Sequence, residues 1–261
     1  MKQLNTKIIK NEQVAPGFYR MRIESGYLSG KSKPGQFVEV RCSEGSDPLL
    51  RRPLGVHRII NNGIEILYEV VGKGTKVLSG KKTGEGLDII GPLGNGFDIV
   101  SADTAIIVAG GIGVAPLMAL AEKLVSRRGS VIVLIGACKK EHILCERDFK
   151  NTGAKVLTAT EDGSCGKKGR VTDILEDMLR LPVFGARSPI YACGPSGMLA
   201  AVARIAGSNR IPCQVSLEER MACGVGVCLG CPVKIRKSST QYEYKMVCKD
   251  GPVFNAEDIA W

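Results

Sequence analysis

The chain has 261 residues, a formal net charge of +10 and a hydrophobic content of 44%. This length allows about two domains with buried cores, and the composition excludes a disordered or fibrous protein. The basic residues are scattered in short pairs, without the clustered stripe or interleaved aromatic residues typical of nucleic-acid binding. We therefore predict no nucleic-acid partner, and we attribute the positive charge to a solvated surface, phosphate-bearing cofactors or an acidic partner protein.

The N-terminal stretch MKQLNTKIIKNEQ contains no apolar segment long enough for a signal peptide. The uncharged run 104–121 reaches the length of a membrane span, but Gly110, Gly111, Gly113 and Pro116 divide it into a strand, a turn and a helix. We predict that the protein has no membrane contact and lies in the cytoplasm. In that reducing compartment, ten cysteines indicate metal ligation or redox chemistry rather than disulfide bonds.

Residues 1–100 are predicted to form short strands separated by turns. The strands include 17–24, 35–41 and a hairpin in which 56–60 pairs with 64–71 across the turn Asn61-Asn62-Gly63. Short strands at this spacing indicate an antiparallel barrel or sandwich.

The pattern changes in residues 101–213. Ile106, Ile107 and Val108 form a continuous apolar run, as expected of a strand that is covered on both faces. A glycine turn and a helical pattern over 116–127 follow. Strand and helix patterns then alternate: 131–136 and a helical segment from 141, 155–159 and 172–181, and 190–192 and 197–206. This alternation predicts a parallel sheet with helices on its faces, an architecture that commonly binds nucleotides.

Residues 214–261 form a third segment, in which four cysteines alternate with glycines. The segment is too short for an independent apolar core, so a metal centre would supply the missing stability.

The cysteine spacing is the most specific motif. Cys223, Cys228 and Cys231 stand as C-x4-C-x2-C, and Cys248 follows after sixteen intervening residues. This is the plant-type arrangement of a 2Fe–2S cluster, for which tight, glycine-rich loops bring thiolates and backbone amides around a small inorganic core. A structural zinc site prefers two short C-x2-4-C pairs, and here only Cys228 and Cys231 fit one. Inert buried thiols are the remaining alternative.

Two glycine-containing turns follow predicted strands. The segment 108–118 (VAGGIGVAPLM) lets a dinucleotide phosphate approach a helix N-terminus, although Pro116 stands where the Rossmann fingerprint has its third glycine. The segment 193–198 (CGPSGM) lies at another strand end, where ligands bind in parallel sheets. The alternatives are a turn packed under the sheet and, for Cys193, a small apolar core residue.

Two motifs in the first domain are candidates for a flavin-phosphate clamp. The segment 51–55 (RRPLG) offers an arginine that can bind a pyrophosphate with two hydrogen bonds, and 72–75 (GKGT) offers amides and a hydroxyl at the start of a short helix. Taken separately, each is more often a solvated arginine pair or an ordinary turn.

The order of these motifs, together with Gly91-Pro-Leu-Gly-Asn-Gly96, resembles the ferredoxin reductase superfamily. The segments 219–231 and 248–254 are similar to a narrower family, the electron transfer subunits of B-type dihydroorotate dehydrogenases. The resemblance covers essentially the whole chain, and the cysteine segment is its most specific part.

The resemblance implies an FAD-binding barrel over 1–100, an NAD-binding α/β domain over 101–213 and a 2Fe–2S segment over 214–261. It implies a partner, an FMN-containing catalytic subunit, in a heterotetramer with two copies of each subunit. Electrons would run from dihydroorotate to the partner's FMN, then to the cluster, FAD and NAD⁺, in pyrimidine biosynthesis. The chain alone would not oxidise dihydroorotate.

The resemblance also implies roles for individual residues. Arg52, Pro53 and Leu54 would border the flavin and its phosphates, Glu69, Val70 and Val71 would lie along it, and Gly74 and Thr75 would contact the pyrophosphate. Gly111, Gly113, Pro116, Cys193, Gly194 and Pro195 would face the nicotinamide nucleotide. Cys223, Cys228, Cys231 and Cys248 would hold the cluster. Our own hypothesis is that residues around 225–229 contact the partner, because electron transfer needs cofactors close together.

One position departs from the family pattern. Gly55 stands where the family commonly has Ser or Thr, whose hydroxyl can hydrogen-bond the flavin N5, so here a backbone amide would serve instead. No residue is predicted as a catalytic acid or base, and the only histidines, His57 and His142, are interpreted as incidental. Such a chain leaves the chemistry to its cofactors.

Two other functions remain open. The same layout suits a ferredoxin:NAD(P) reductase-like or hydrogenase-associated subunit, and Lys167, Lys168 and Arg170 are placed to hold the 2′-phosphate of NADPH. A zinc-stabilised interaction module on a degenerate nucleotide-binding fold belongs to a different class, and it predicts a colourless protein.

Overall fold

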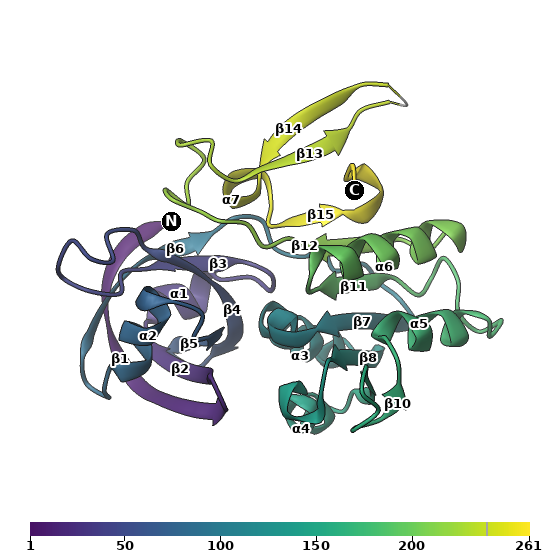
Figure 1. The fold of residues 1–261 in the computed structure, drawn as a ribbon, viewed down its shortest axis with the longest axis horizontal. Coiled ribbons are helices and arrows are strands. Elements are labelled where there is room, and N and C mark those ends of the chain that lie inside the picture. Colours follow the sequence, from purple (N-terminus) through teal and green to yellow (C-terminus); the bar gives the residue numbers. More distant parts are fainter. Residues whose placement is uncertain (239) are drawn as a thin grey trace.

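A computed structural model of the protein describes residues 1–238 and 240–261. Six antiparallel strands close into a barrel in the order β1 (Lys2–Ala15), β2 (Phe18–Glu24), β5 (Gly63–Glu69), β4 (Arg52–Ile60), β3 (Phe37–Val40) and β6 (Gly86–Leu93). Two short helices, α1 (Gly26–Lys31) and α2 (Lys73–Gly80), connect the strands of this purple and blue body (Figure 1). The predicted antiparallel barrel and its β4–β5 hairpin are confirmed.

Side chains alternate between the two faces of strand β3, as the pleat of a strand requires. Val38 and Val40 point into the barrel core, whereas Phe37 packs in the cluster of apolar residues that belongs to the α/β and C-terminal segments. The outer face of β3 is therefore covered by other parts of the chain.

The second body is a seven-stranded sheet with helices on both faces. Its order is β10 (Lys167–Lys168), β9 (Lys155–Thr160), β8 (Ser130–Ala137), β7 (Thr104–Gly110), β11 (Ile190–Cys193), β12 (Cys213–Ser216) and β15 (Val253–Asn255). All neighbours run parallel except β15, which is antiparallel to β12. The 3₁₀ helix η1 (Gly111–Leu117) and the helices α3 (Met118–Ser126), α4 (Glu146–Asn151), α5 (Val171–Leu179) and α6 (Ser196–Ser208) follow successive strands, with a short 3₁₀ helix, η2 (Lys140–His142), preceding α4.

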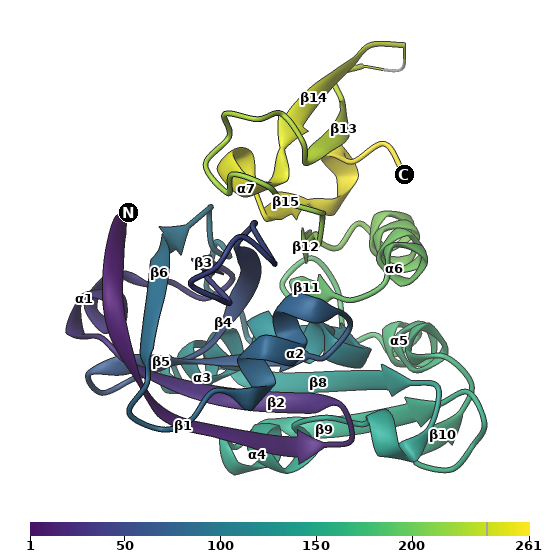
Figure 2. The same ribbon diagram turned by 60° about the vertical axis from the view of Figure 1, so that its left-hand side comes forward.

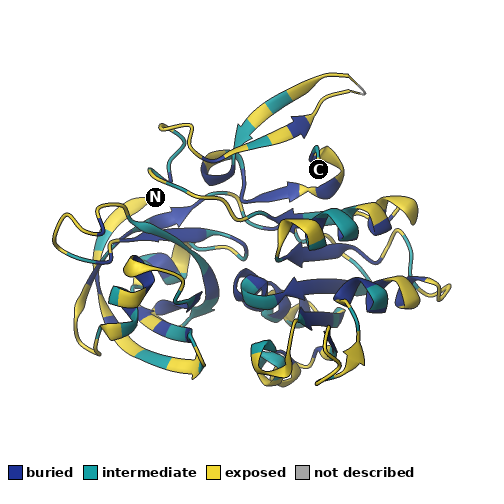
Figure 3. Ribbon diagram, viewed as in Figure 1, coloured by how far each residue is buried: buried dark blue, intermediate teal, exposed yellow. Residues whose placement is uncertain are grey.

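Strand β7 illustrates why the sheet is covered on both faces. Ile106 and Val108 pack with α5 and α6, whereas Ile107 and Ala109 pack with α3 and α4. Figure 3 shows the resulting buried central strands between more exposed helices. The continuous apolar run thus gives the buried parallel strand that it predicts.

The C-terminal segment lies across the tops of both bodies (Figures 1 and 2). A loop that carries Cys223, Cys228 and Cys231 leads into the hairpin of β13 (Pro232–Arg236) and β14 (Tyr242–Met246), which projects away from the two bodies. Helix α7 (Val247–Asp250) brings Cys248 back, and β15 and the 3₁₀ helix η3 (Ala256–Asp258) end the chain. The predicted boundary between residues 213 and 214 falls inside β12. None of the described helices combines the length and apolar character that a membrane crossing requires.

Candidate functional site: a flavin cavity, a nucleotide turn and a cysteine loop

A cavity of about 340 Å³ lies where the barrel meets the sheet. Strands β4 and β5 and the start of α2 form one wall, η1 forms a second, and the segment 216–221 after β12 forms a third. Eight of the residues predicted to bind cofactors line it: Arg52, Pro53, Leu54, Gly55, Glu69, Val71, Thr75 and Pro116. Val70 instead packs on the barrel core, and Gly74 lies next to the cavity against Arg52.

Arg52 and the start of α2 form a positively polarised end of this cavity. The Arg52 Nη1 donates to the carbonyl oxygens of Leu50, at 2.6 Å, and Arg51, at 3.2 Å, which fixes the guanidinium. A Cβ at Gly74 would lie 2.7 Å from Arg52 Nε, so only glycine lets the guanidinium lie over the helix start. Gly72 is the N-cap and offers no side chain to the first-turn amides, which are therefore free to bind an anion.

Gly55 lies beside η1, the first of the two glycine-containing turns. A Cβ built on Gly55 would be 3.5 Å from the Cβ of Pro116, which is an ordinary van der Waals contact. The position therefore has room for a small side chain, and its backbone φ is not in the region that favours glycine. The absence of a hydroxyl at this position is a feature of the sequence that the fold does not require.

The two glycine-containing turns pack directly against each other. A Cβ at Gly113 would lie 2.3 Å from the carbonyl oxygen of Cys193, so the close approach of the turns requires glycine. The Cys193 side chain is fully buried in the apolar core, and burial raises the pKa of its thiol well above the usual value. Only its backbone, with Gly194 and Pro195, remains to face a ligand.

The segment 216–221 was not predicted to contribute to the cavity. Ser216, Leu217, Glu218, Glu219 and Met221 line it, as do Ile112 and Ala115 of η1 and Gly35, Phe37, Leu67, Tyr68 and Pro252. The Glu218 side chain is exposed at the rim of the cavity, where partial desolvation by the neighbouring protein raises the pKa of its carboxyl and the Glu69 carboxylate adds to this effect. The signal for this segment was its place directly after β12, since the carboxyl ends of parallel strands border ligand sites.

The cysteine loop directs backbone amides at sulfur. The amides of Val225, Val227 and Cys228 each donate to Cys223 Sγ at 3.4 Å, and the amide of Gly226 donates to Cys248 Sγ at 3.1 Å. Burial alone would raise the pKa of Cys223, but these donors outweigh it and lower the pKa to about 6. The loop therefore stabilises negative charge on sulfur, as a thiolate ligand requires.

The four predicted ligands lie close enough to affect one another. The side chains of Cys223 and Cys228 interact, as do those of Cys231 and Cys248, and Cys223 also contributes to the raised pKa of Cys248. Cys228 is exposed, whereas Cys231 and Cys248 are buried. Among the described residues, no three His, Cys, Asp or Glu side chains converge as the ligands of one ion would.

Glu39 of the barrel lies directly beneath this loop. A Cβ at Gly224, whose φ is +66°, would lie 2.5 Å from Glu39 Cγ. Glu39 is 1% exposed, and neither of its carboxylate oxygens has a hydrogen-bond partner among the described residues. Burial raises the pKa of Glu39 to about 7, against the opposing effect of Arg51.

The residues predicted to hold a 2′-phosphate differ in their availability. The ammonium of Lys167 pairs with Asp177 of α5 and also donates to the carbonyl oxygen of Asp173. The stem of Lys168 packs on Gly163. Lys167 thus already has an acidic partner, which weakens the case for NADPH.

Comparisons with known proteins agree with this geometry. A family model described as the iron-sulfur cluster binding domain of dihydroorotate dehydrogenase B matches residues 218–260, and a model described as an oxidoreductase NAD-binding domain matches 107–204. The dihydroorotate dehydrogenase B (NAD(+)) electron transfer subunit of Desulforamulus reducens is 39% identical over 100% of this chain and 99% of its own length. That of a Geobacillus species is 40% identical over 99% of both chains.

Solved structures extend the comparison. A chain from an NADH-dependent reduced ferredoxin-NADP oxidoreductase is 32% identical, with a TM-score of 0.86 and coverage of 99% of this chain and 90% of that one. A ferredoxin NADP⁺ reductase from Neisseria gonorrhoeae with bound FAD and NADP is 16% identical, with a TM-score of 0.67 over 80% of this chain and 92% of that one. The second likeness shows the fold alone.

Proposed function

Because the chain belongs to the family of electron transfer subunits of dihydroorotate dehydrogenase B, we propose that it passes electrons from a dihydroorotate-oxidising partner to NAD⁺ in pyrimidine biosynthesis. The chain is an NAD-dependent oxidoreductase subunit whose cofactors are FAD and a 2Fe–2S cluster. When bound, these groups supply hydride exchange with the nicotinamide and one-electron exchange with the partner. Oxidation of dihydroorotate itself belongs to the partner.

The contiguity of the three sites carries this proposal. Strand β3 touches the cysteine loop through Glu39 and Gly224, and its neighbour β4 lines the flavin cavity. Another wall of the same cavity is η1, which we call the nucleotide turn because we propose that it binds the nicotinamide nucleotide. A cluster, a flavin and a nicotinamide bound at these places would be neighbours, which short-range electron and hydride transfer requires.

We assign the flavin to the cavity. Arg52 and the free amides at the start of α2, near Gly74 and Thr75, would bind the pyrophosphate. Pro53, Leu54, Gly55, Glu69 and Val71 would line the flavin. The Thr75 hydroxyl accepts hydrogen bonds from the amides of Val71, at 3.0 Å, and Gly72, at 3.3 Å, so its role in this proposal is to shape the turn.

The nicotinamide nucleotide would bind at the paired turns. Gly111 and Pro116 of η1 would face it from one side, and Gly194 and Pro195 from the other, while Gly113 and Cys193 hold the two turns together through their backbone contact. The acidic partner of Lys167 favours NAD over NADP.

Cys223, Cys228, Cys231 and Cys248 would hold the cluster. The amide donors to Cys223 and Cys248 would then point at ligand sulfurs, where they lower the cost of negative charge.

The partner in this proposal is an FMN-containing catalytic subunit, in an assembly with two copies of each chain. The cysteine loop supports a contact there, because Val227 and Leu229 are 79% and 67% exposed beside the predicted cluster. The boundaries 1–100, 101–213 and 214–261 and a cytoplasmic location complete the proposal.

A second candidate function is supported by the likeness to the NADH-dependent reduced ferredoxin-NADP oxidoreductase chain. In that case the electrons would be exchanged with a ferredoxin-linked partner in place of a dihydroorotate-oxidising one. The two candidates share cofactors and differ in the protein that docks at the cysteine loop.

Reconstitution tests the proposal. The holoprotein is mixed anaerobically with the dihydroorotate-oxidising subunit of the same organism, and NADH formation is followed after addition of dihydroorotate and NAD⁺. We expect NADH formation that requires both chains. If the pair forms no NADH, but the holoprotein alone exchanges electrons between NADH and ferredoxin, the second candidate replaces the first.

A further inference from the structure

His57 lies on the strand that joins the flavin cavity to the nucleotide turn. Strand β4 lines the cavity with Arg52 to Gly55 and then continues toward η1 and α3. His57 is completely buried, and its Nδ1 is 2.9 Å from the carbonyl oxygen of Ala115. A carbonyl oxygen can only accept, so Nδ1 carries the proton and donates.

The neutral ring is the stable form of His57. Burial lowers its pKa to about 4, outweighing the hydrogen bond to Ala115, so the imidazole is uncharged at neutral pH. Its Nε2 has no hydrogen-bond partner among the described residues, which agrees with an Nδ1–H tautomer. The ring is thus a single fixed donor aimed at the turn.

The recipient of this hydrogen bond is part of the site. Ala115 and the following Pro116 both line the flavin cavity. Pro116 also lies next to Gly55, two residues before His57 on β4, in the van der Waals contact described above. The barrel strand therefore holds the turn at two successive points, one apolar and one hydrogen-bonded.

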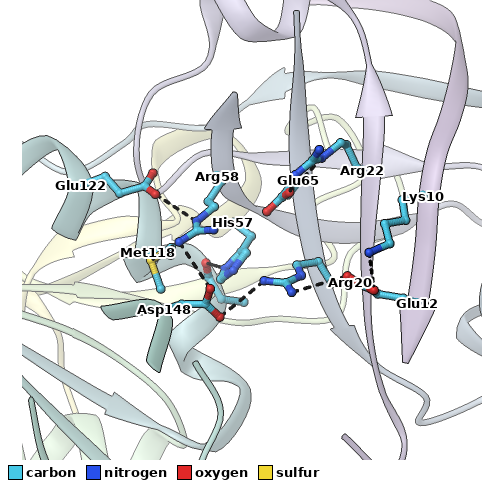
Figure 4. Close-up of polar contacts among 11 residues, drawn as sticks. Lys10, Glu12, Arg20, Arg22, His57, Arg58, Glu65, Met118, Glu122 and Asp148 are labelled. Atoms are coloured by element: carbon cyan, nitrogen blue, oxygen red, sulfur yellow. Dashed lines mark hydrogen bonds and ion pairs between the residues drawn. The ribbon is translucent and has the colours of Figure 1, made fainter. Parts of the chain in front are cut away.

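The ion pairs described beside His57 do not reach η1, although Arg58 Nη2 also donates to Met118 Sδ, directly after η1, at 3.6 Å. Arg58 pairs with Glu122 at 2.9 Å and with Asp148 at 3.6 Å, and Arg20 pairs with Asp148 at 3.4 Å. Figure 4 shows these ion pairs beside His57, on α3 and at the start of α4. They join the two bodies at their partly exposed rim, whereas His57 reaches the buried carbonyl beside the cavity.

We propose that His57 is a positioning residue for hydride transfer: its hydrogen bond to Ala115 holds the nucleotide turn at the distance from β4 at which nicotinamide and flavin react. The inference rests on the proposed function. The step is NADH + FAD → NAD⁺ + FADH⁻, in which the C–H bond at C4 of the dihydronicotinamide breaks and an N–H bond forms at flavin N5. His57 exchanges no proton in it and acts through Ala115 and Pro116 alone.

A matched pair of variants isolates the hydrogen bond. His57→Asn places an amide N–H near the position of Nδ1, and His57→Leu has almost the same size without a donor. The holoproteins are mixed anaerobically with NADH, and the rate constant of flavin reduction and its dependence on NADH concentration are measured by stopped flow, with protonated and 4-deuterated NADH.

We expect the Leu variant to reduce its flavin at least about 10-fold more slowly at saturating NADH, because misplacement by about 1 Å costs up to about 100-fold in rate. The Asn variant should stay within about 3-fold of the unmodified protein. The Leu variant should also show the larger deuterium isotope effect and a weaker long-wavelength absorbance from stacked nicotinamide and flavin. A purely structural role would change neither signal in protein that retains FAD.

Glu122→Gln serves as the control, because it removes the ion pair with Arg58 and leaves the hydrogen bond from His57 to Ala115 in place. Its rate constant of flavin reduction should be unchanged. If the Leu variant loses FAD, His57→Gln is used, since it moves the donor toward the Nε2 position and should also slow the reaction. Equal rates in the unmodified, Asn and Leu proteins, or equal slowing in Asn and Leu, overturn the inference. A flavin that NADH does not reduce in the unmodified protein overturns the proposed function as well.

Discussion

The barrel meets its two neighbours through joints of different chemistry. Toward the α/β domain, Arg20 and Arg58 face Glu122 and Asp148, and the buried His57 donates to a carbonyl (Figure 4). Toward the cysteine loop, Glu39 is buried without a hydrogen-bond partner among the described residues. The buried hydrogen bond from His57 fixes a geometry, because breaking it leaves a buried polar group unsatisfied. An unpaired acid fixes little, but its charge depends on its surroundings.

This difference corresponds to what each joint serves. The proposed hydride transfer needs precise placement of the reacting atoms, and the directional contact beside the nucleotide turn is the hydrogen bond from His57 to Ala115. The joint beside the cysteine loop would lie next to the proposed cluster, whose charge changes with its oxidation state. Because its pKa is raised to about 7, Glu39 is partly protonated at neutral pH, which would reduce the negative charge there.

The largest effect is expected when one of the predicted cluster ligands is removed. In Cys231→Ser, a buried sulfur of the Cys231–Cys248 pair is lost, so iron and sulfide should fall to near zero. Flavin reduction by NADH should persist, because that chemistry lies at the other joint. Metal analysis and stopped flow measure both.

Cys138→Ser, at an exposed cysteine outside the loop, is the control and should retain the iron. A Cys231→Ser protein with a full complement of iron and sulfide would refute the ligand assignment.

The buried Glu39 and His57 should make the free energy of unfolding depend on pH with opposite signs. The pKa of Glu39 is raised from 4.5 to about 7, so the folded state keeps a proton that the unfolded state has lost between these pH values. Stability contributed by Glu39 therefore falls as pH rises from 4.5 to 7, by about 3 kcal/mol in total. Thermal midpoints of Glu39→Gln and the unmodified protein should diverge across this window, with the variant gaining as pH rises.

His57 behaves in the opposite way. Its pKa is lowered from 6.5 to about 4, so the unfolded state binds the extra proton between these pH values. Stability is fully present above pH 6.5 and is lost as pH falls toward 4, again by about 3 kcal/mol. In His57→Asn this slope should disappear. Parallel curves for variant and unmodified protein between pH 4 and 6.5 would contradict the burial of a neutral imidazole.

A smaller effect is expected from overfilling the contact between the two turns. In Gly113→Ala, the new methyl group would lie 2.3 Å from the Cys193 carbonyl oxygen, so the turns must separate. We expect a loss of about 1–3 kcal/mol in stability and weaker NADH binding. Gly197→Ala on α6 is the control, because its Cβ meets nothing within 4 Å and alanine favours a helix. Equal NADH affinity in the two variants would argue against a nucleotide site at these turns.

The smallest effect is expected from the partly exposed ion pair between Arg58 of the barrel and Glu122 of α3. Glu122→Gln removes the ion pair with Arg58, whose side chain is 20% exposed against 37% for Glu122. Exposed pairs contribute about 0.2–1 kcal/mol and are screened by salt. The loss in unfolding free energy should therefore stay below about 1 kcal/mol and shrink further in 0.5 M salt (roughly a 4 Å Debye length).

Local motifs were predictable from the sequence. The strand of residues 106–108, the hairpin at Asn61-Asn62-Gly63 and the cysteine spacing depend on near neighbours, and the structure contains each as a strand, a hairpin or a loop with amides directed at sulfur. Strand β1 was missed, because register shifts at Ile8 and Gln13 interrupt the two-residue alternation on which strand prediction depends.

The contacts between distant segments were not predictable. Glu39 and Gly224 are 185 positions apart in the sequence, and neither has a motif that points to the other. His57 is interpreted as incidental from the sequence, because nothing there shows that its hydrogen-bond partner is a backbone carbonyl 58 positions away. Glu218 became part of the cavity only through the crossover that places β12 beside β11. Such residues join the sites, and only the fold brings them together.

The most direct test of the account is an anaerobic titration of the purified chain with NADH, together with analysis of iron, sulfide, zinc and flavin. The account predicts about two irons, two sulfides and one FAD per chain. It also predicts loss of the flavin absorbance on addition of NADH, followed by the electron paramagnetic resonance signal of a reduced 2Fe–2S cluster. A colourless protein that contains zinc, or a flavin that NADH leaves oxidised, would contradict the central claim.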